Sequence, residues 1–366
     1  MKFSINRESL LKPLQQVAGV VERRQTLPVL SNVLLEVSGK RLSLTGTDLE
    51  LELVARLDLE GDIQEGDTTV PARKLVDICK SLPAEAEIRF ELDGEKLLVR
   101  SGRSRFSLAT LPANEFPSLD EATGGETFRM APSALRHLID STAFSMAQQD
   151  VRYYLNGMLF EIKPTLIRSV ATDGHRLAMC DCEVEGPATD ASVIVPRKGV
   201  MELSRLLGDA PAEVSVTVGT NHVRVQAGDI TFTSKLVDGK FPDYERVVPR
   251  EGQRLVTADR ETMRQALGRV AILSNEKYRG IRVQLAEGSL SVQANNPEQE
   301  EAEEEISVDY SGSELEIGFN VSYLLDVFNA MEGDSVEIQL GDSNSSALVA
   351  DPDDRAALYV VMPMRL

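Results

Sequence analysis

Residues 70–99, VPARKLVDICKSLPAEAEIRFELDGEKLLV, decide the fold because the chain repeats their pattern. Residues 195–225 read VPRKGVMELSRLLGDAPAEVSVTVGTNHVRV, and residues 319–349 read FNVSYLLDVFNAMEGDSVEIQLGDSNSSALV. Each stretch predicts an amphipathic helix and then a hairpin, because apolar residues first recur at helical spacing and then alternate around turn residues. The starting positions 70, 195 and 319 indicate a period of about 125 residues.

Other landmarks keep this spacing. The opening segments FSINRESLLKPLQQVAG, FRMAPSALRHLIDSTAF and LVTADRETMRQALGRVA all predict a short strand followed by a helix. Two further sets of dipeptides recur in order, and they are Thr47-Asp48, Thr172-Asp173 and Asn295-Asn296, then Phe116-Pro117, Phe241-Pro242 and Met362-Pro363. We therefore interpret the 366-residue chain as three copies of a unit of about 122 residues.

Each unit is itself predicted to be double. In the first unit, helices near residues 7–20 and 71–82 are each followed by strands with two-residue alternation. This predicts an α+β fold of three similar domains, each with two helices on antiparallel sheets. Charged linkers with Gly or Pro near 118–127 and 246–254 place the domains at 1–120, 127–246 and 253–366.

The composition is that of a folded protein, with 42% hydrophobic and 27% charged residues. No apolar run has the length of a membrane span or a signal peptide, so we expect a cytoplasmic protein without a membrane partner. Cys79, Cys180 and Cys182 are expected to be structural thiols. The net charge of −19 argues against a nucleic-acid partner when taken whole, but residues 251–366 hold 22 acidic and only 9 basic residues.

The stretch 170–179, VATDGHRLAM, is the only one that looks catalytic. Phosphate-binding and nucleophile-elbow motifs are absent from the sequence, and the three histidines are not spaced for a metal. Asp173 and His175 could form an acid–base pair. However, Asp48 and Asn296 occupy the position of Asp173 in the other copies, which favours a turn residue. We interpret Thr172 and Asp173 as scaffold and Gly174 to Leu177 as a binding loop.

Basic residues at two predicted helix starts oppose the dipoles of their own helices, so they indicate either a solvated charged face or a binding role. Arg73-Lys74 and Arg197-Lys198 follow Val-Pro in the first and second copies, where a helix N-terminus disfavours cations. An external polyanion would meet both the helix dipole and these side chains. Arg23-Arg24 after the first helix corresponds to Gln148-Gln149 in the second copy, which Arg152, Tyr153 and Tyr154 follow.

The two ends of the chain have opposite charges. Arg103 and Arg105 lie on one side of a predicted strand, whereas residues 298–305 contain six acidic residues in eight positions. Complementary ends of this kind favour head-to-tail association, which closes a ring or grows a filament.

At this point the sequence resembles one family over all 366 residues. The segments TGTDLELE (45–52), ATDGHRLA (171–178), KFPDYERVVP (240–249) and VMPMRL (361–366), together with the repeat, are similar to the bacterial β sliding clamps of replicative DNA polymerase. The resemblance implies the DNA-clamp fold and a head-to-tail homodimeric ring of six domains around duplex DNA. It implies no catalytic residue, no cofactor and no metal. Contacts would go to phosphates without reading bases.

The resemblance also implies three sets of site residues. DNA contacts correspond to Arg24, Arg73, Gln149, Tyr153 and Tyr154, with Lys198 added as the repeat equivalent of Arg73. The subunit interface corresponds to Arg103, Arg105, Phe106, Leu108, Ile272, Leu273, Glu298, Glu300, Glu301, Glu303 and Glu304. A pocket for partner peptides corresponds to Leu155, Thr172, Gly174, His175, Arg176, Leu177, Pro242, Arg246, Val247, Tyr323, Val360, Met362, Pro363, Met364 and Arg365.

The partners that the resemblance implies are double-stranded DNA, the single strand of a primer–template, and a second copy of the chain. Short peptides containing Gln and Leu or Phe would come from the clamp loader, from the replicative and other DNA polymerases, and from repair proteins. Two alternatives stay open from the residues alone. One is a structural protein that assembles head to tail without enclosing DNA, and the other is a hydrolase that uses Asp173 and His175.

Overall fold

A computed structural model describes residues 1–22, 27–119, 125–185, 190–210, 213–249, 252 and 254–365. Contacts divide the chain into two compact units. Unit 1 contains Met1–Ser133 and Met201–Leu236, and unit 2 contains Ala134–Val200 and Val237–Leu366. The division runs through the middle repeat, so each unit combines one outer repeat with part of the central one.

One motif, a strand, a helix and three strands, occurs twice in each repeat of the described chain. The first repeat contains β1 (Lys2–Asn6), α1 (Arg7–Val20), β2 (Asn32–Ser38), β3 (Arg41–Thr47), β4 (Leu51–Asp58), β6 (Gly66–Pro71), α2 (Ala72–Ser81), β7 (Glu87–Asp93), β8 (Lys96–Ser101) and β9 (Ser104–Ala109). An extra strand, β5 (Glu60–Gln64), separates its two halves. The doubling that the sequence predicted within the first unit is therefore present.

The other two repeats follow the same order. The second contains β10 (Glu126–Met130), α3 (Pro132–Asp140), β11 (Gly157–Lys163), β12 (Leu166–Thr172), β13 (Arg176–Glu183), β14 (Ala191–Pro196), α4 (Arg197–Leu207), β15 (Val214–Val218), β16 (His222–Ala227) and β17 (Ile230–Lys235). The third contains β18 (Arg254–Asp259), α5 (Arg260–Val270), β19 (Gly280–Ala286), β20 (Ser289–Asn295), β21 (Glu301–Ser307), β22 (Leu315–Asn320), α6 (Val321–Ala330), β23 (Ser335–Leu340), β24 (Ala347–Ala350) and β25 (Ala357–Val361). Short 3-10 turns, such as η3 (Ala143–Ser145), η4 (Tyr153–Leu155), η5 (Tyr244–Arg246) and η6 (Ala271–Leu273), join these elements.

The two halves of each repeat exchange their first strands. In the first repeat β1 pairs with β7 of the second half, and β6 pairs with β2 of the first half. The same reciprocal exchange joins β10 to β15 and β14 to β11, then β18 to β23 and β22 to β19. Neither half can therefore complete its sheet without the other.

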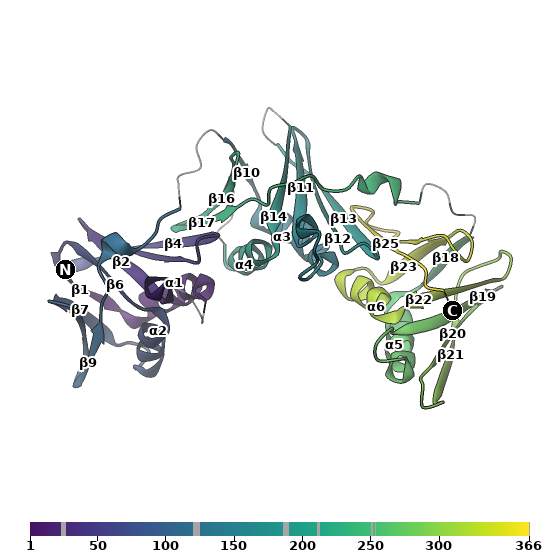
Figure 1. The fold of residues 1–366 in the computed structure, drawn as a ribbon, viewed down its shortest axis with the longest axis horizontal. Helices are drawn as coiled ribbons and strands as arrows, with labels where there is room; N and C mark the ends of the chain where they lie inside the picture. Colours follow the sequence, from purple (N-terminus) through teal and green to yellow (C-terminus); the bar gives the residue numbers. More distant parts are fainter. Residues whose placement is uncertain are drawn as a thin grey trace. The chain divides into compact units, whose positions relative to one another are not determined.

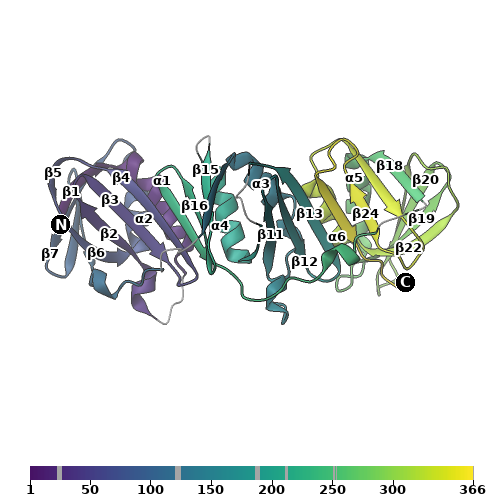
Figure 2. The same cartoon turned by 90° about the horizontal axis from the view of Figure 1, so that it is seen from above.

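Sheets also continue from one repeat into the next. In unit 1, β4 of the first repeat pairs antiparallel with β17 of the second, giving the eight-stranded order β10-β15-β16-β17-β4-β3-β2-β6. In unit 2, β13 pairs with β25, giving β14-β11-β12-β13-β25-β24-β23-β18 (Figures 1 and 2). The strands that meet at both junctions are the last strands of their halves.

The helices cover one face of the sheets in each unit. In unit 1, α1 packs beside α2 and against β3 and β4, and in unit 2, α5 packs beside α6 and against β20 and β21 (Figure 1). Helix α1 buries Leu10, Leu14 and Val17, which follow the helical spacing in the sequence. The predicted α+β fold is confirmed, with helices on antiparallel sheets.

One equivalence drawn from the sequence is wrong. The sequence matched Met362-Pro363 with Phe241-Pro242, but the strand register gives a different partner. The N–H of Met362 donates to the carbonyl of His175 (3.0 Å), as that of Lys235 donates to Glu50 (2.8 Å). Met362 is therefore the structural equivalent of Lys235, because a shared dipeptide does not set strand register.

The Thr-Asp turns of the first two repeats are the same structure. In turns 47–51 and 172–176 the threonine hydroxyl donates to the carbonyl four residues later, at 2.7 and 2.6 Å. The aspartate carboxylate accepts the N–H groups two and three residues later, at 2.8 and 2.7 Å in the first turn and 2.9 and 3.1 Å in the second. The residue between has a positive φ, 80° at Leu49 and 89° at Gly174. The interpretation of Thr172 and Asp173 as scaffold agrees with this geometry.

Replacing Leu49 with glycine should stabilise the first repeat. A leucine in the left-handed region costs about 1–2 kcal/mol, and glycine returns part of this gain through its larger unfolded-state entropy. We expect Leu49→Gly to raise the free energy of unfolding by about 0.5–1 kcal/mol, as measured by urea denaturation. Glu50→Gly in the same turn is the control and should lower it. A loss of stability for Leu49→Gly would show that its side chain, rather than its backbone, governs this position.

Candidate functional site

The turn 172–176 carries no acid–base pair. The Asp173 carboxylate accepts the backbone N–H groups of His175 and Arg176 and pairs with the Arg176 side chain at 3.1 Å. The exposed His175 ring instead stacks on the Tyr323 ring, with ring centroids 6.3 Å apart and planes inclined by 19°. The aspartate is a turn residue and ion-pair partner, and nothing in this geometry activates a nucleophile.

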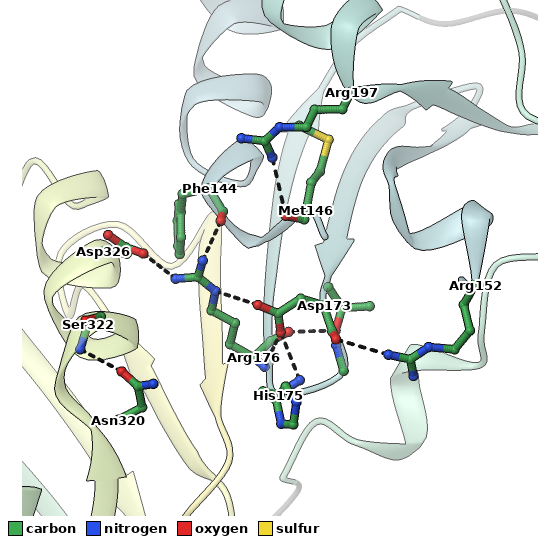
Figure 3. A network of polar contacts seen from close by, with 12 residues as sticks. Phe144, Met146, Arg152, Asp173, His175, Arg176, Arg197, Asn320, Ser322 and Asp326 are labelled. Atoms are coloured by element: carbon green, nitrogen blue, oxygen red, sulfur yellow. Dashed lines mark hydrogen bonds and ion pairs between the residues drawn. The ribbon is translucent and has the colours of Figure 1, made fainter. Parts of the chain in front are cut away.

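Arg176 is the centre of a polar network that joins the second and third repeats within unit 2 (Figure 3). Only 11% of its side chain is exposed. Besides Asp173, its guanidinium donates to the Asp326 carboxylate on α6 (2.5 Å) and to the Phe144 carbonyl (2.8 Å). The same group lies over the rings of Phe144 and Tyr323, 5.3 and 4.6 Å from their centroids. The arginine is therefore held on several sides by the protein itself.

The C-terminal segment lies against this turn and against β22. Met362 donates its N–H to the His175 carbonyl at 3.0 Å, and Met364 donates to the Gly318 carbonyl at 2.8 Å. Met362, Pro363 and Met364 are half-buried, whereas Arg365 is exposed. The structure thus brings together the turn, Tyr323 and the end of the chain, which the sequence assigned to one pocket.

Three of the predicted pocket residues lie deeper. Leu155, Leu177 and Val360 are between 1% and 3% exposed and belong to one buried apolar cluster. Leu177 and Val360 face each other across the β13–β25 pair. These side chains form the apolar floor at the junction of the second and third repeats, rather than an open surface.

The linker before the third repeat contains three more of the predicted pocket residues. Pro242, Arg246 and Val247 are exposed, and the Arg246 side chain pairs with Asp243 at 2.6 Å. Two separate surface hollows are each lined by some of the predicted pocket residues, Arg246 and Val247 in one and Pro363, Met364 and Arg365 in the other. One of about 400 Å³ is lined by Arg246, Val247, Val248, Pro249, Gly252, Gln339, Gly341, Ser345 and Ser346. The other, of about 680 Å³, is lined by Glu316, Ile317, Gly318, Ser343, Asn344, Pro363, Met364 and Arg365.

Tyr244 anchors this linker to the sheet. Its hydroxyl donates to Glu161 at 2.6 Å and accepts from Arg168 at 3.3 Å, while Arg168 forms a two-point ion pair with Asp181 at 2.6 and 2.7 Å. Burial, together with the hydrogen bond to Glu161, raises the pKa of Tyr244 to about 12. The hydroxyl therefore stays protonated and keeps donating.

The loop before β11 contacts the turn 172–176. Arg152 pairs with Asp150 (2.9 Å) and donates to the Asp173 carbonyl (3.3 Å), and hydrogen bonding to Arg152 lowers the pKa of Asp150 to about 2. A Cβ added to Gly174 would lie 3.0 Å from the Arg152 guanidinium. The positive φ therefore favours glycine at 174, and a larger residue there would displace the end of the Arg152 side chain.

The predicted DNA contacts lie on loops and helix starts. Gln149 is exposed with a φ of 58°, and Tyr153, 56% exposed, meets Tyr154 edge to face at 5.7 Å. Arg73 is exposed in the first turn of α2, and Lys198 is half-buried in the first turn of α4. Arg24 lies outside the described residues.

The predicted interface residues lie at two sheet edges. Strand β9 presents exposed Arg105, with Arg103 in the turn before it, and packs Leu108 inward with Phe106 half-buried. Glu298, Glu300, Glu301 and Glu303 are exposed on or before β21, Ile272 is 75% exposed and Leu273 is half-buried. Glu304 differs, because its side chain lies on the opposite face of the strand from those of Glu301 and Glu303. It pairs with Arg269, and this hydrogen bond lowers the pKa of Glu304.

Sequence reasoning missed three residues of the pocket region. Phe144, Tyr244 and Asp326 were not singled out, although Tyr244 lies within the motif KFPDYERVVP. Phe144 and Asp326 gave no local signal, because their partner Arg176 is 32 and 150 residues away. For Asp326 the one indication is that α6 contains no basic residue with which it could pair.

Two cysteines of the chain, Cys79 and Cys180, are buried thiols. Burial raises the pKa of the Cys79 thiol to about 11 and that of Cys180 to about 12, which keeps both in the unreactive thiol form. Within the described part of the chain, no group of three or more His, Cys, Asp or Glu residues is placed to hold a metal ion. In the same residues, no helix is long and apolar enough to cross a membrane.

The chain matches known proteins over its whole length. Models for the N-terminal, central and C-terminal domains of the DNA polymerase III beta subunit match residues 1–120, 129–243 and 245–365. The chain is 63% identical over 367 residues to the beta sliding clamp of Pseudomonas aeruginosa, with 100% of both chains covered. A crystal structure of the DNA polymerase III subunit beta from Pseudomonas aeruginosa matches with a TM-score of 0.98 and 62% identity, and one of that organism's sliding clamp bound to griselimycin matches with 0.97 and 63%, each covering 100% of both chains.

A repeated α+β fold, matched over its whole length by clamp structures, defines a sliding clamp. The chain belongs to the family of DNA polymerase III beta subunits, the bacterial β sliding clamps. Its function is that of a DNA sliding clamp for polymerase III processivity, and it is not an enzyme. The family and function that the sequence predicted are confirmed, and the hydrolase alternative is dismissed.

Removing the Tyr244 hydroxyl should loosen the linker. Tyr244→Phe leaves Glu161 without its donor, so we expect the free energy of unfolding to fall by about 1–2 kcal/mol in urea denaturation. Tyr153→Phe is the control, because Tyr153 is 56% exposed, and it should change stability by less than about 0.5 kcal/mol. Equal effects of the two variants would contradict an anchoring role for Tyr244.

Proposed function

We propose that two copies of the chain close head to tail into a ring of six domains around duplex DNA. The domains are those at 1–120, 127–246 and 253–366. The turn 172–176, the linker and the C-terminal segment bind partner peptides on this ring. The partners are polymerases, the clamp loader and repair proteins.

The observation that carries the ring is the pairing of last strands. Two junctions within the chain are made by last strands, β4 with β17 and β13 with β25. The two remaining last strands, β9 and β21, each lie at the edge of a described sheet. An open strand edge is a template for pairing with another chain. A β9–β21 pair between two copies would repeat the geometry of the internal junctions and close the ring.

Charges support the same pairing. Arg100 and Arg105 face each other across β8 and β9, an arrangement of like charges that destabilises the isolated edge. On β21 the exposed Glu301, Glu303 and Glu305 share one face of the strand. An acidic strand from a second copy would relieve the repulsion on β9. Glu304 contributes less to this contact than its neighbours, because Arg269 already engages it.

An apolar contact is expected to supply most of the affinity. Exposed ion pairs contribute little, whereas burying a large aliphatic side chain contributes about 1.5–3 kcal/mol. Ile272 is 75% exposed and follows α5 directly, beside half-buried Leu273. We propose that both pack against Phe106 and Leu108 of the second copy.

Contacts with DNA go to phosphates and stacked bases. Arg73 and Lys198 lie in the first turns of α2 and α4, where the helix N-terminus adds its own partial positive charge. Exposed Gln149 and Tyr153, with Tyr154, offer an amide and aromatic faces to a primer–template single strand. Binding of this kind reads no sequence, which suits a protein that slides.

The peptide pocket has an apolar floor and polar walls. The buried cluster with Leu155, Leu177 and Val360 supplies the floor, and His175, Tyr323 and the tail supply the walls. Met362 and Met364 are flexible side chains that adapt to different partners. The griselimycin complex of the relative from Pseudomonas aeruginosa supports a ligand site in this family.

The dimer is tested by truncating its apolar contact. We expect Ile272→Ala with Leu273→Ala to sediment as a monomer at micromolar concentration, because the remaining ion pairs are weak. Leu255→Ala is the matched control, since Leu255 is also exposed, at 50%, but lies on β18. An unchanged dimer mass for the double variant would remove this interface assignment.

The pocket is tested by removing the tail. Deleting residues 362–366 takes away the backbone contacts of Met362 and Met364, so a fluorescent peptide with Gln, Leu and Phe should no longer bind in an anisotropy titration. The deletion spares β9 and β21, and sedimentation should still give a dimer. Met364→Ala should weaken peptide binding, and Met201→Ala, on exposed α4 surface, should not. Unchanged affinity after the deletion would refute the pocket.

A further inference from the structure

The guanidinium of Arg176 has little capacity left for a ligand. It meets two carboxylates and one carbonyl, and two aromatic rings cover it. The sequence grouped Arg176 with residues that contact a peptide. A side chain that is only 11% exposed and bonded on three sides acts on the site in another way.

What Arg176 does hold is helix α6. Tyr323 and Asp326 are three residues apart on this helix, so their side chains share one face. The arginine contacts both, with its charged group 4.6 Å from the Tyr323 ring centroid and 2.5 Å from the Asp326 carboxylate. Two contacts one turn apart fix both the position of the helix and its rotation about its axis.

The Tyr323 ring, which Arg176 contacts, is also in contact with the exposed part of the site. His175 stacks on Tyr323, and the tail residue Met362 is bonded to the backbone of His175. The order of contacts therefore runs from Asp326 to Arg176, from Arg176 to Tyr323, and from Tyr323 to His175. Asp326 itself is 42% exposed and contributes little to stability as a partly exposed ion pair.

We infer that Asp326 is a positioning residue of the peptide pocket, which acts through Arg176 to hold the Tyr323 ring in its binding position. This inference rests on the proposed pocket. Its occupant is the short peptide of Gln and Leu or Phe residues proposed above. Asp326 does not touch that peptide, and its carboxylate charge is what the role requires.

The test is a thermodynamic cycle with the full-length dimer. The affinity of a fluorescein-labelled synthetic peptide containing Gln, Leu and Phe is measured for Asp326→Asn, Tyr323→Ala and the double variant. Asp326→Asn removes a charged hydrogen-bond partner of Arg176, and we expect about a tenfold loss of affinity. In the Tyr323→Ala variant the same substitution should cause no further loss of affinity, because the ring that Asp326 positions is absent.

Controls separate positioning from folding. Asp326→Glu keeps the charge and should retain affinity within about threefold of the wild-type value. Asp140→Asn also removes a helix aspartate paired with an arginine (3.0 Å), and it should leave affinity unchanged. Unchanged binding by Asp326→Asn, or losses that add in the double variant, would overturn the inference. If Tyr323→Ala itself binds normally, the proposed pocket fails instead.

Discussion

The structure depends on backbone pairing between strands that belong to different half-repeats. Each half-repeat gives its first strand to the other half, and the last strands β4, β17, β13 and β25 pair across the two junctions between repeats. Backbone hydrogen bonds therefore cross from the first repeat to the second within unit 1, and from the second repeat to the third within unit 2. The stability of each repeat and its connection to the next therefore come from one set of contacts.

The polar network around Arg176 has a different task at the same junction. Hydrogen bonds between β13 and β25 fix how far apart the second and third repeats lie along the sheet. They do not determine how the helices on the sheet face are turned. Arg176 lies between two aromatic rings and two carboxylates, and its hydrogen bonds have preferred directions. These contacts orient α6 relative to the turn 172–176.

Much of the fold was predictable because the repeat supplied three independent views of one pattern. The helix expected at 7–20 is Arg7–Val20, and the α+β class is confirmed. Strand exchange was not predictable, since alternation along a strand tells which face is buried but not which strand lies beside it. The same limit produced the wrong equivalence of Met362 with Phe241.

The turn 172–176 of the candidate site could be predicted from the sequence, but the contacts of Arg176 could not. Comparison of copies identified Asp173 as a turn residue, and the hydrogen bonds of turn 172–176 agree. The burial and the hydrogen-bond partners of Arg176 could not be predicted, because Phe144 and Asp326 lie far from it in the sequence. Likewise, the acidic run at 298–305 reads as one strip, but the two-residue period of β21 turns Glu304 toward Arg269.

The Thr-Asp turn has a consequence for how such a chain evolves. Its shape is set by a threonine hydroxyl and an aspartate carboxylate bonded to the backbone, with almost the same distances in two copies. The side chains that follow the aspartate do not set the shape of the turn. After duplication, one copy can acquire a histidine and an arginine there while another keeps a glutamate and a leucine, and both still fold. Turns of one shape therefore carry different side chains in the two copies, without a change in the architecture of the repeat.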